Sequence, residues 1–181
     1  EPAPAAPVLL PWEVDLAAER ALAAGDPRFL PRRDEAEAVL ENGTITARLS
    51  TRGTELALPS ASFTIGVDTI GRASVRVRLA APASVELAGS DVLLRRDAGV
   101  VEWWRALPSG LEHGVTLSER PAGEGPLVVR GAVGDGLTPR ARTEDEIELV
   151  APSGHVAARY SHLSVRDADG ARVEARLGVL G

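Results

Sequence analysis

The stretch Ser74-Val75-Arg76-Val77-Arg78-Leu79 indicates the fold class of this chain. Its aliphatic residues alternate with arginines, which is the period of two expected for a β-strand whose two faces meet different surroundings. The pattern predicts a strand that turns its aliphatic residues toward a core and its arginines toward water. Similar alternation recurs from Thr44 to Leu177 in short segments that end at Gly, Asp or Pro.

These alternating segments predict about a dozen short strands at intervals of roughly 8–12 residues. They cover residues 44–50, 55–58, 62–67, 74–79, 85–87, 92–95, 99–104, 114–117, 127–133, 146–150, 156–160, 163–165 and 172–177. Short strands joined by turns at this spacing are typical of two stacked antiparallel sheets. We therefore predict an all-β protein, an antiparallel β-sandwich with a core of Val, Leu, Ile and Ala and a short N-terminal helix.

The first quarter of the chain has helical rather than strand composition. Residues 12–24 are rich in Ala, Leu and Glu, follow a proline and end at Gly-Asp-Pro, which predicts a helix. A second helix is predicted over 34–42, where an Asp N-cap precedes a Glu by three residues and an Asn-Gly pair follows. We therefore expect two parts, residues 1–43 with a Pro/Ala-rich start and a helical segment, and residues 44–181 as the β-sandwich domain.

Composition narrows the possible functions. The chain of 181 residues carries a net charge of -6, which gives no electrostatic footprint for nucleic acid or anionic membrane. It contains no cysteine, so a disulfide scaffold, a thiolate metal site and a cysteine nucleophile are excluded. No apolar run approaches the roughly 18 residues of a membrane span, so we expect no membrane insertion. Arg in place of Lys is typical of a GC-biased genome, and single arginines are therefore weak functional signals.

Two acidic segments are candidates for metal binding or for turns. Asp167-Ala168-Asp169-Gly170 resembles part of a calcium loop, because alternating carboxylates supply hard oxygen ligands. The remaining positions of a 12-residue loop are missing, and a β-hairpin turn needs the same Asp and Gly residues. We therefore favour a turn and keep Asp167 and Asp169 as weak metal candidates. The acidic run 144–148 is predicted to form a solvated hairpin edge.

Catalytic patterns are weak in this sequence. His113, His155 and His162 lack the close spacing of zinc ligands, although His155 and His162 would meet if a hairpin brought them together. There is no G-x-S-x-G motif, and Ser153 reads as a turn residue without an acid partner. No phosphate-binding or dinucleotide motif occurs. We predict no catalytic residue and no cofactor. The alternative hypothesis is a metal-dependent hydrolase that uses these histidines.

The segment Glu102-Trp103-Trp104-Arg105 carries the candidate binding residues. Adjacent side chains in a strand point to opposite faces, so one tryptophan is expected in the core and the other on the opposite face. An exposed Trp flanked by Arg and Glu suits stacking on a sugar ring, which makes Glu102, Trp103, Trp104 and Arg105 candidates for glycan binding. We favour packing over this interpretation, with the second ring covered by the loop 108–113 or by the N-terminal helix.

Three stretches of the chain carry a pattern known from exported bacterial proteins: WWRALPSGLEHGVTL (103–117), RPAGEGPL (120–127) and YSHLSVRDADGAR (160–172). They resemble the N-terminal β-domain that lies upstream of FG-GAP or VCBS-type β-propeller repeats in proteins of myxobacteria and related bacteria. Residues 41–58 are similar more loosely to the opening strands of that family. The resemblance covers about residues 40–177 and rests mainly on turn glycines and core positions.

The resemblance implies an exported, non-catalytic β-domain with no catalytic residues to transfer, and further repeat domains in the same polypeptide. The Pro/Ala-rich start is typical of a segment that follows a removed signal peptide, and equally of an arbitrary boundary in a longer chain. We therefore expect a secreted or cell-surface location in a high-GC bacterium. The leading functional hypothesis is a structural or interaction module whose partner is a protein or a surface glycan.

Overall fold

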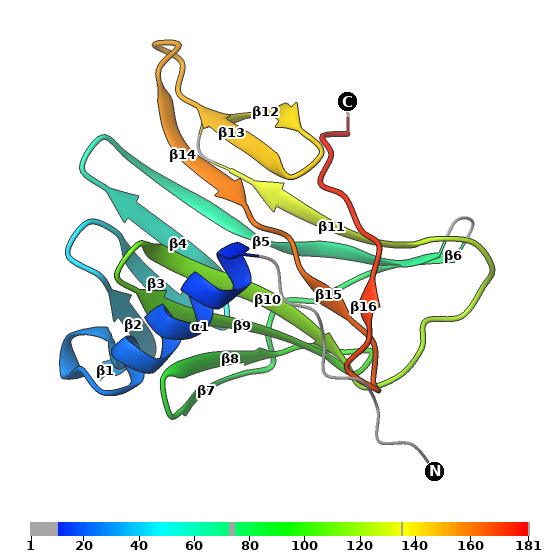
Figure 1. The fold of residues 1–181 in the computed structure, drawn as a ribbon, viewed down its shortest axis with the longest axis horizontal. Coiled ribbons are helices and arrows are strands. Elements are labelled where there is room, and N and C mark those ends of the chain that lie inside the picture. Colours follow the sequence, from blue (N-terminus) through cyan, green and yellow to red (C-terminus); the bar gives the residue numbers. More distant parts are fainter. Residues whose placement is uncertain (1–10, 73–74, 135, 181) are drawn as a thin grey trace. The chain divides into compact units, whose positions relative to one another are not determined.

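The computed structural model describes residues 11–72, 75–134 and 136–180 of the chain (Figure 1). Strands account for 53% of the described residues and form several antiparallel sheets, which confirms the predicted all-β class. One α-helix, α1 (Pro11–Ala24), is present in the described part, over the range that the sequence predicts. The chain divides into two compact units, Glu19–Gly136 and the remainder, which are described separately below.

The larger unit contains two antiparallel sheets. The first sheet has the order β1-β2-β3-β4-β5-β11, and β6 also pairs with β5; its strands are β1 (Arg32–Asp34), β2 (Glu37–Glu41), β3 (Thr46–Ser50), β4 (Gly53–Leu58), β5 (Ala61–Arg72), β6 (Val75–Arg78) and β11 (Leu127–Val133). The second sheet has the order β10-β9-β8-β7; its strands are β7 (Ser84–Ala88), β8 (Asp91–Arg95), β9 (Val100–Leu107) and β10 (Gly110–Leu117).

The core of the larger unit lies between these two sheets. Strand β2 contacts β7 and β9, and strand β3 contacts β7 and β8. The largest fully buried apolar side chains come from both sheets: Phe63, Leu40, Leu49, Leu94, Val39, Val92 and Val100. Each such side chain stabilises the fold by about 1.5–3 kcal/mol through burial. An aliphatic sandwich core is therefore confirmed.

The predicted helix over residues 34–42 is wrong, because this segment forms strands β1 and β2. Strand β2 pairs with β3, and it buries Ala38, Val39 and Leu40 almost completely. The Asn-Gly pair belongs to the turn that joins the two strands, where the side-chain oxygen of Asn42 accepts the N–H of Ile45 at 2.8 Å. Burial against the second sheet overrides the local helix signal, and the first sheet begins at Arg32.

Strand β6 also departs from the prediction. All four of its residues are exposed, and Val75 and Val77 keep 43% and 46% of their surface. The valines therefore do not turn into a core as the alternating pattern suggests. The cause is the position of β6, which pairs only with the end of β5 from Thr69 to Arg72.

The smaller unit contains a three-stranded sheet and a hairpin. The sheet has the order β12-β13-β14, with β12 (Thr138–Thr143), β13 (Glu146–Val150) and β14 (Val156–Ser161), and the hairpin joins β15 (Val165–Arg166) to β16 (Arg172–Val173). The first turn of α1 is bound to this hairpin through Glu13, whose buried carboxylate accepts hydrogen bonds from Ser164 at 2.9 Å, Arg166 at 3.0 Å and Arg172 at 3.2 Å.

The C-terminal part of α1, from Glu19, belongs to the larger unit, where Arg20 forms an ion pair with Glu112 of β10. A short 3-10 helix, η1 (Pro27–Phe29), follows. Within the described residues, no helix is long and apolar enough to cross a membrane.

Candidate functional site

Strand β9 divides the Glu102–Arg105 motif between its two faces. Trp104 and Glu102 point into the core and are 2% and 0% exposed, whereas Trp103 and Arg105 lie on the outer face and are partly exposed. This confirms that one tryptophan of the pair belongs to the core. On the outer face, Trp103 lies between Leu93 of β8 and Gly114 of β10 in the strand register.

The indole of Trp103 lies over Gly114. A Cβ atom added at Gly114 would come within 2.0 Å of Cζ2, 2.2 Å of Cε2 and 2.6 Å of Cη2 of the indole. Only a residue without a side chain leaves room for the ring at this position. Gly114 therefore allows the indole to lie across β10 instead of projecting away from the sheet.

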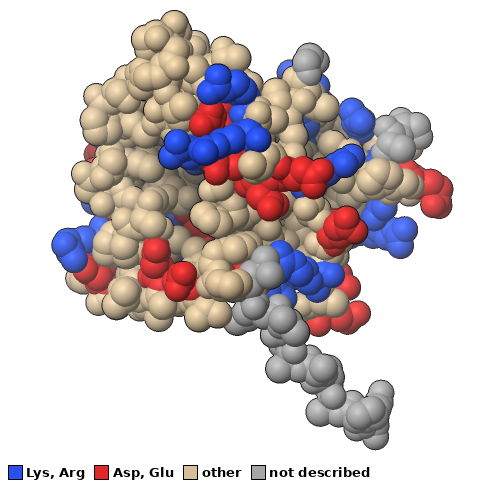
Figure 2. Space-filling model, turned by 45° about the horizontal axis from the view of Figure 1, so that its top comes forward, with Lys and Arg blue, Asp and Glu red and all other residues tan. Residues whose placement is uncertain are grey.

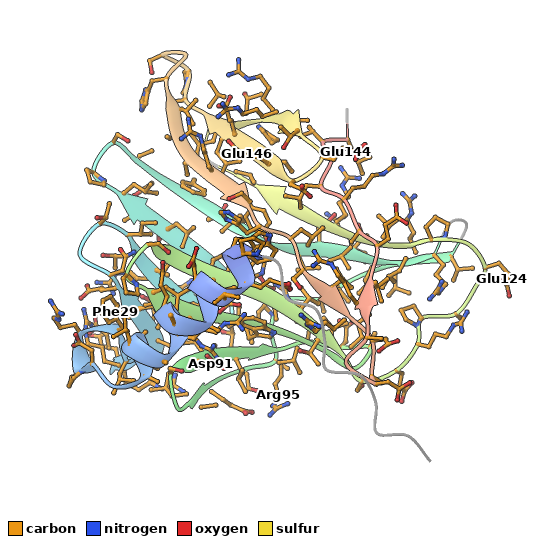
Figure 3. The ribbon with its side chains drawn as sticks, in the orientation of Figure 1. Phe29, Asp91, Arg95, Glu124, Glu144 and Glu146 are labelled. Carbon is orange, nitrogen blue, oxygen red and sulfur yellow. The ribbon has the colours of Figure 1, made fainter. Side chains whose placement is uncertain are left out.

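Beside the indole, the outer face forms a shallow depression of about 360 Å³. Its lining comes only from β8, β9 and β10: Leu93, Val101 and Trp103 supply apolar surface, and Asp91, Arg95, Arg105 and Thr116 supply polar groups. Asp91 and Arg95, which mark the two ends of β8, are labelled in Figure 3. An apolar surface with a few polar groups around it is the usual composition of a ligand site.

A bidentate ion pair forms one side of the depression. Arg105 donates from Nε to Oδ1 of Asp91 at 2.6 Å and from Nη2 to Oδ2 at 2.8 Å. The hydrogen bonds with Asp91 raise the pKa of the Arg105 guanidinium, and they outweigh the opposite effect of burial. Arg105 Cζ is 6.0 Å from the centroid of the Trp103 ring. The guanidinium, the carboxylate and the indole thus have fixed relative positions.

A second ion pair lies at the other end of β8. Arg95 donates from Nε to Oε1 of Glu86 on β7 at 2.7 Å, and both side chains are largely exposed. The hydrogen bond with Arg95 lowers the pKa of the Glu86 carboxyl. On the face that Figure 2 displays, basic and acidic side chains also lie next to one another.

The inner face of β9 carries a buried charged cluster that the sequence did not indicate. Glu102 accepts hydrogen bonds from Arg96 Nε at 2.9 Å and Nη2 at 2.6 Å, and its Oε1 is 3.0 Å from His113 Nε2. The His113 ring stacks on Trp104 with a centroid distance of 4.1 Å. Burial raises the pKa of Glu102, but hydrogen bonds and charges from His113 and Arg96 outweigh it, and the net pKa is lowered. Glu102 is thus an ionised core residue without exposed surface.

The structure does not bring the histidines of the smaller unit together. His155 and His162 flank the six-residue strand β14, which separates them by about 23 Å at roughly 3.3 Å per residue. The expectation that they meet across a hairpin is therefore wrong, because the hairpin places His155 opposite Ala151 of the preceding segment. His155 Nδ1 is 2.6 Å from Ser153 Oγ on an exposed turn. Among the described residues, no three His, Asp or Glu side chains are grouped as metal ligands.

The Asp-rich segment forms a hairpin turn, as favoured from the sequence. Asp167 Oδ1 accepts the backbone N–H of Asp169 at 3.0 Å and of Ala171 at 2.8 Å, and Gly170 has a φ of 79°. One of the two weak metal candidates thus has an oxygen engaged in the turn between β15 and β16.

The prediction of a solvated hairpin edge for the acidic run is correct for Glu144 and Asp145, which form the exposed turn between β12 and β13, and wrong for Glu146 and Glu148. Glu146 and Glu148 lie on β13, the central strand of its sheet. Glu148 pairs with Arg140 of β12 at 2.6 Å, and Glu146 pairs with Arg159 of β14 at 3.2 Å. The carboxylates thus form cross-strand ion pairs, which stabilise sheet pairing.

Sequence reasoning identified Trp103 and Arg105 but missed the other residues of the depression, such as Asp91 and Leu93, and the glycine beneath the indole, Gly114. The Pro-Ser turn at 108–109 would have been a usable signal. A two-residue turn there pairs Leu107 with Gly110, and counting outward along the hairpin then places Trp103 opposite Gly114. The residues of β8 have no comparable local signal.

Comparison with known proteins adds no relative to this description. No family model, no curated protein and no solved structure matches the chain. The resemblance to domains upstream of β-propeller repeats therefore stays a prediction.

Proposed function

We propose that this chain is a non-catalytic interaction module of a secreted or surface-exposed bacterial protein, and that it binds carbohydrate in the depression beside Trp103. The observation that carries this proposal is the indole that lies over Gly114, beside the bidentate pair of Arg105 and Asp91. The indole supplies an apolar ring surface, and the ion pair supplies a donor and an acceptor at a fixed distance from it.

Carbohydrate is the ligand class that fits both features. A pyranose ring presents C–H groups on its faces and hydroxyl groups around its edge, so it needs an aromatic surface together with polar partners. The depression offers the indole of Trp103 with Leu93 and Val101 as apolar surface, and Asp91 and Arg105 as polar partners. Its volume of about 360 Å³ lies within the range of roughly 300–1,000 Å³ for ligand pockets.

The proposal also accounts for the groups that suggested catalysis. His113 is occupied in a buried cluster with Glu102 and Arg96. The exposed pair of Ser153 and His155 lies on the hairpin turn that precedes β14, outside the depression. These groups have positions suited to packing and to turn structure, which supports an interaction module over a metal-dependent hydrolase.

A glycan array tests the proposal directly. The wild-type chain is expected to retain at least one class of glycan, and Trp103→Ala should lose that binding because the stacking surface is removed. Trp12→Ala is the matched control, since Trp12 lies on α1 and does not line the depression. Circular dichroism of both variants verifies their folding. A chain that binds no glycan, or binding that is equally strong in Trp103→Ala, would refute carbohydrate binding at this site.

A second interaction surface favours contact with protein. Strand register places Val77 and Val129 on either side of Ile70. It places Val75 and Leu127 on either side of Arg72, which lies two residues further along the same face of β5. These four aliphatic residues are 38–46% exposed. An exposed aliphatic patch on a sheet is typical of an interaction surface. If the glycan test is negative, this face becomes the site through which a structural module would contact protein, including further domains of the same polypeptide.

A further inference from the structure

The charges around the Trp103 depression cancel in pairs. Arg105 pairs with Asp91 and Arg95 pairs with Glu86, both within 2.7 Å. Behind Arg105, Glu112 lies 3.7 Å from its Nη1 and also pairs with Arg20 of α1. Three guanidinium groups thus face three carboxylates, and the site presents no net charge to a ligand.

Arg105 is held away from anionic ligands in particular. An arginine recognises a carboxylate or a sulfate by donating two parallel N–H groups. In Arg105 that pair of donors, Nε and Nη2, is already bonded to the two oxygens of Asp91. An acidic sugar would have to displace Asp91 and would then face its carboxylate at close range. A hydroxyl group is uncharged, so it is not repelled by the carboxylate and does not need to displace Asp91.

The Asp91–Arg105 pair retains hydrogen-bond acceptors and donors that hydroxyl groups can use. Each carboxylate oxygen has lone pairs beyond those used by Arg105, and a guanidinium has five N–H donors, of which two are bonded to Asp91. The pair therefore presents an acceptor and a donor side by side. Two adjacent hydroxyl groups of a sugar, one donating and one accepting, satisfy this arrangement.

We propose that the depression binds an uncharged pyranose glycan, with two neighbouring hydroxyl groups on Asp91 and Arg105 and a C–H face on Trp103. This inference rests on the proposed function and specifies the class of glycan. The apolar side chains of Leu93 and Val101 extend the contact with the C–H face.

One substitution is expected to reverse the charge preference. Asp91→Asn keeps the size of the side chain but removes its charge, which leaves Arg105 without its bidentate carboxylate. Binding of neutral glycans should then fall by about tenfold, because the fixed geometry of the guanidinium is lost. Acidic glycans should gain affinity. Asp34→Asn is the matched control, since Asp34 is a strand carboxylate paired with an arginine at 3.0 Å in the other sheet.

Isothermal titration calorimetry with two ligand sets provides the measurement. The neutral set consists of glucan, xylan, mannan and galactan oligosaccharides, and the acidic set of oligogalacturonate, alginate and hyaluronan oligosaccharides. For the wild-type chain we expect binding of a neutral ligand at least about tenfold tighter than that of any acidic ligand. Raising the salt from about 20 to 200 mM should leave this binding unchanged, because no net charge is paired on binding.

The outcomes separate this inference from the proposed function. Tighter binding of an acidic glycan, lost in Trp103→Ala, would overturn the inference and leave carbohydrate binding standing. Neutral binding that Asp91→Asn does not alter would also overturn it, because the hydroxyl contact would then lie elsewhere. No binding in either set would overturn the proposed function itself. Circular dichroism and thermal unfolding of Asp91→Asn verify that the variant is folded.

Discussion

Replacing Gly114 with alanine would test the geometry on which the candidate site depends. The added Cβ would lie 2.0–2.6 Å from three atoms of the Trp103 ring. Carbon atoms that are not bonded pack at about 3.5–4.0 Å, so the indole must move by more than about 1 Å or rotate into solvent. Forcing an additional methyl group into a packed position costs about 1–3 kcal/mol. In a protein of this size each kcal/mol lowers the unfolding midpoint by about 2–4 °C.

Gly110→Ala is the matched control for this experiment. Gly110 begins the same strand, and a Cβ added there meets nothing within 4 Å. Thermal and urea unfolding measure the stability of both variants, and tryptophan emission reports the change around the displaced indole. We expect the loss of stability, a red-shifted emission and weaker glycan binding only in Gly114→Ala. If the two variants unfold at the same midpoint with the same emission, Trp103 does not lie over Gly114 and the site is incorrectly described.

Two further predictions concern the inner face of β9. Trp104→Ala should lower the free energy of unfolding by about 3–5 kcal/mol, because it leaves a cavity in the core. Trp103→Ala, on the outer face, should lower it less, because its ring is partly exposed. Thermal unfolding that ranks the two variants in the opposite order would contradict the assigned faces. Glu102→Gln should cost about 3–5 kcal/mol, since it leaves the guanidinium of Arg96 buried without its carboxylate. Because the folded-state pKa of Glu102 is lowered, its stabilisation is complete above the ordinary glutamate pKa of about 4.3 and is lost as the pH falls further. Urea unfolding between about pH 3 and 7 should therefore show a weaker acid dependence in Glu102→Gln than in the wild type, and an equally steep dependence would contradict this assignment.

Local sequence patterns were sufficient for the type of most elements. The helix over residues 12–24, the strands over 127–133 and 146–150, and the turn at 167–170 occur where the sequence predicts them. Each depends on interactions between residues that are close in the chain, such as backbone propensity, an Asp side chain that bonds its own turn, or alternation along one strand. The division of Trp103 and Trp104 between two faces follows from the same alternation.

Tertiary structure decided the elements whose local signals conflict with burial. Residues 34–42 have the caps of a helix, yet as a strand the segment buries Ala38 and Leu40 on one face and Val39 on the other, and this burial outweighs the helix signal. In β6 the local signal correctly indicates a strand, but the expected burial is absent. An alternating strand needs a second layer to bury its valines, whereas β6 pairs with the end of β5 and leaves Val75 and Val77 exposed. The alternation of a strand defines two faces but does not define which of them is covered.

The candidate site depends on both levels. The sequence by itself determined that Trp103 and Arg105 share one face of a strand, because their spacing of two is a local property. The two-residue turn at 108–109 places Gly114 opposite Trp103, but only the tertiary structure decided that Asp91 neutralises Arg105 and that Glu102 is buried with Arg96. These partners come from other strands or from across a turn, and their register depends on the pairing of whole strands and on the packing of two sheets. Pairing of that kind depends on contacts distant in sequence, for which no single segment carries a signal.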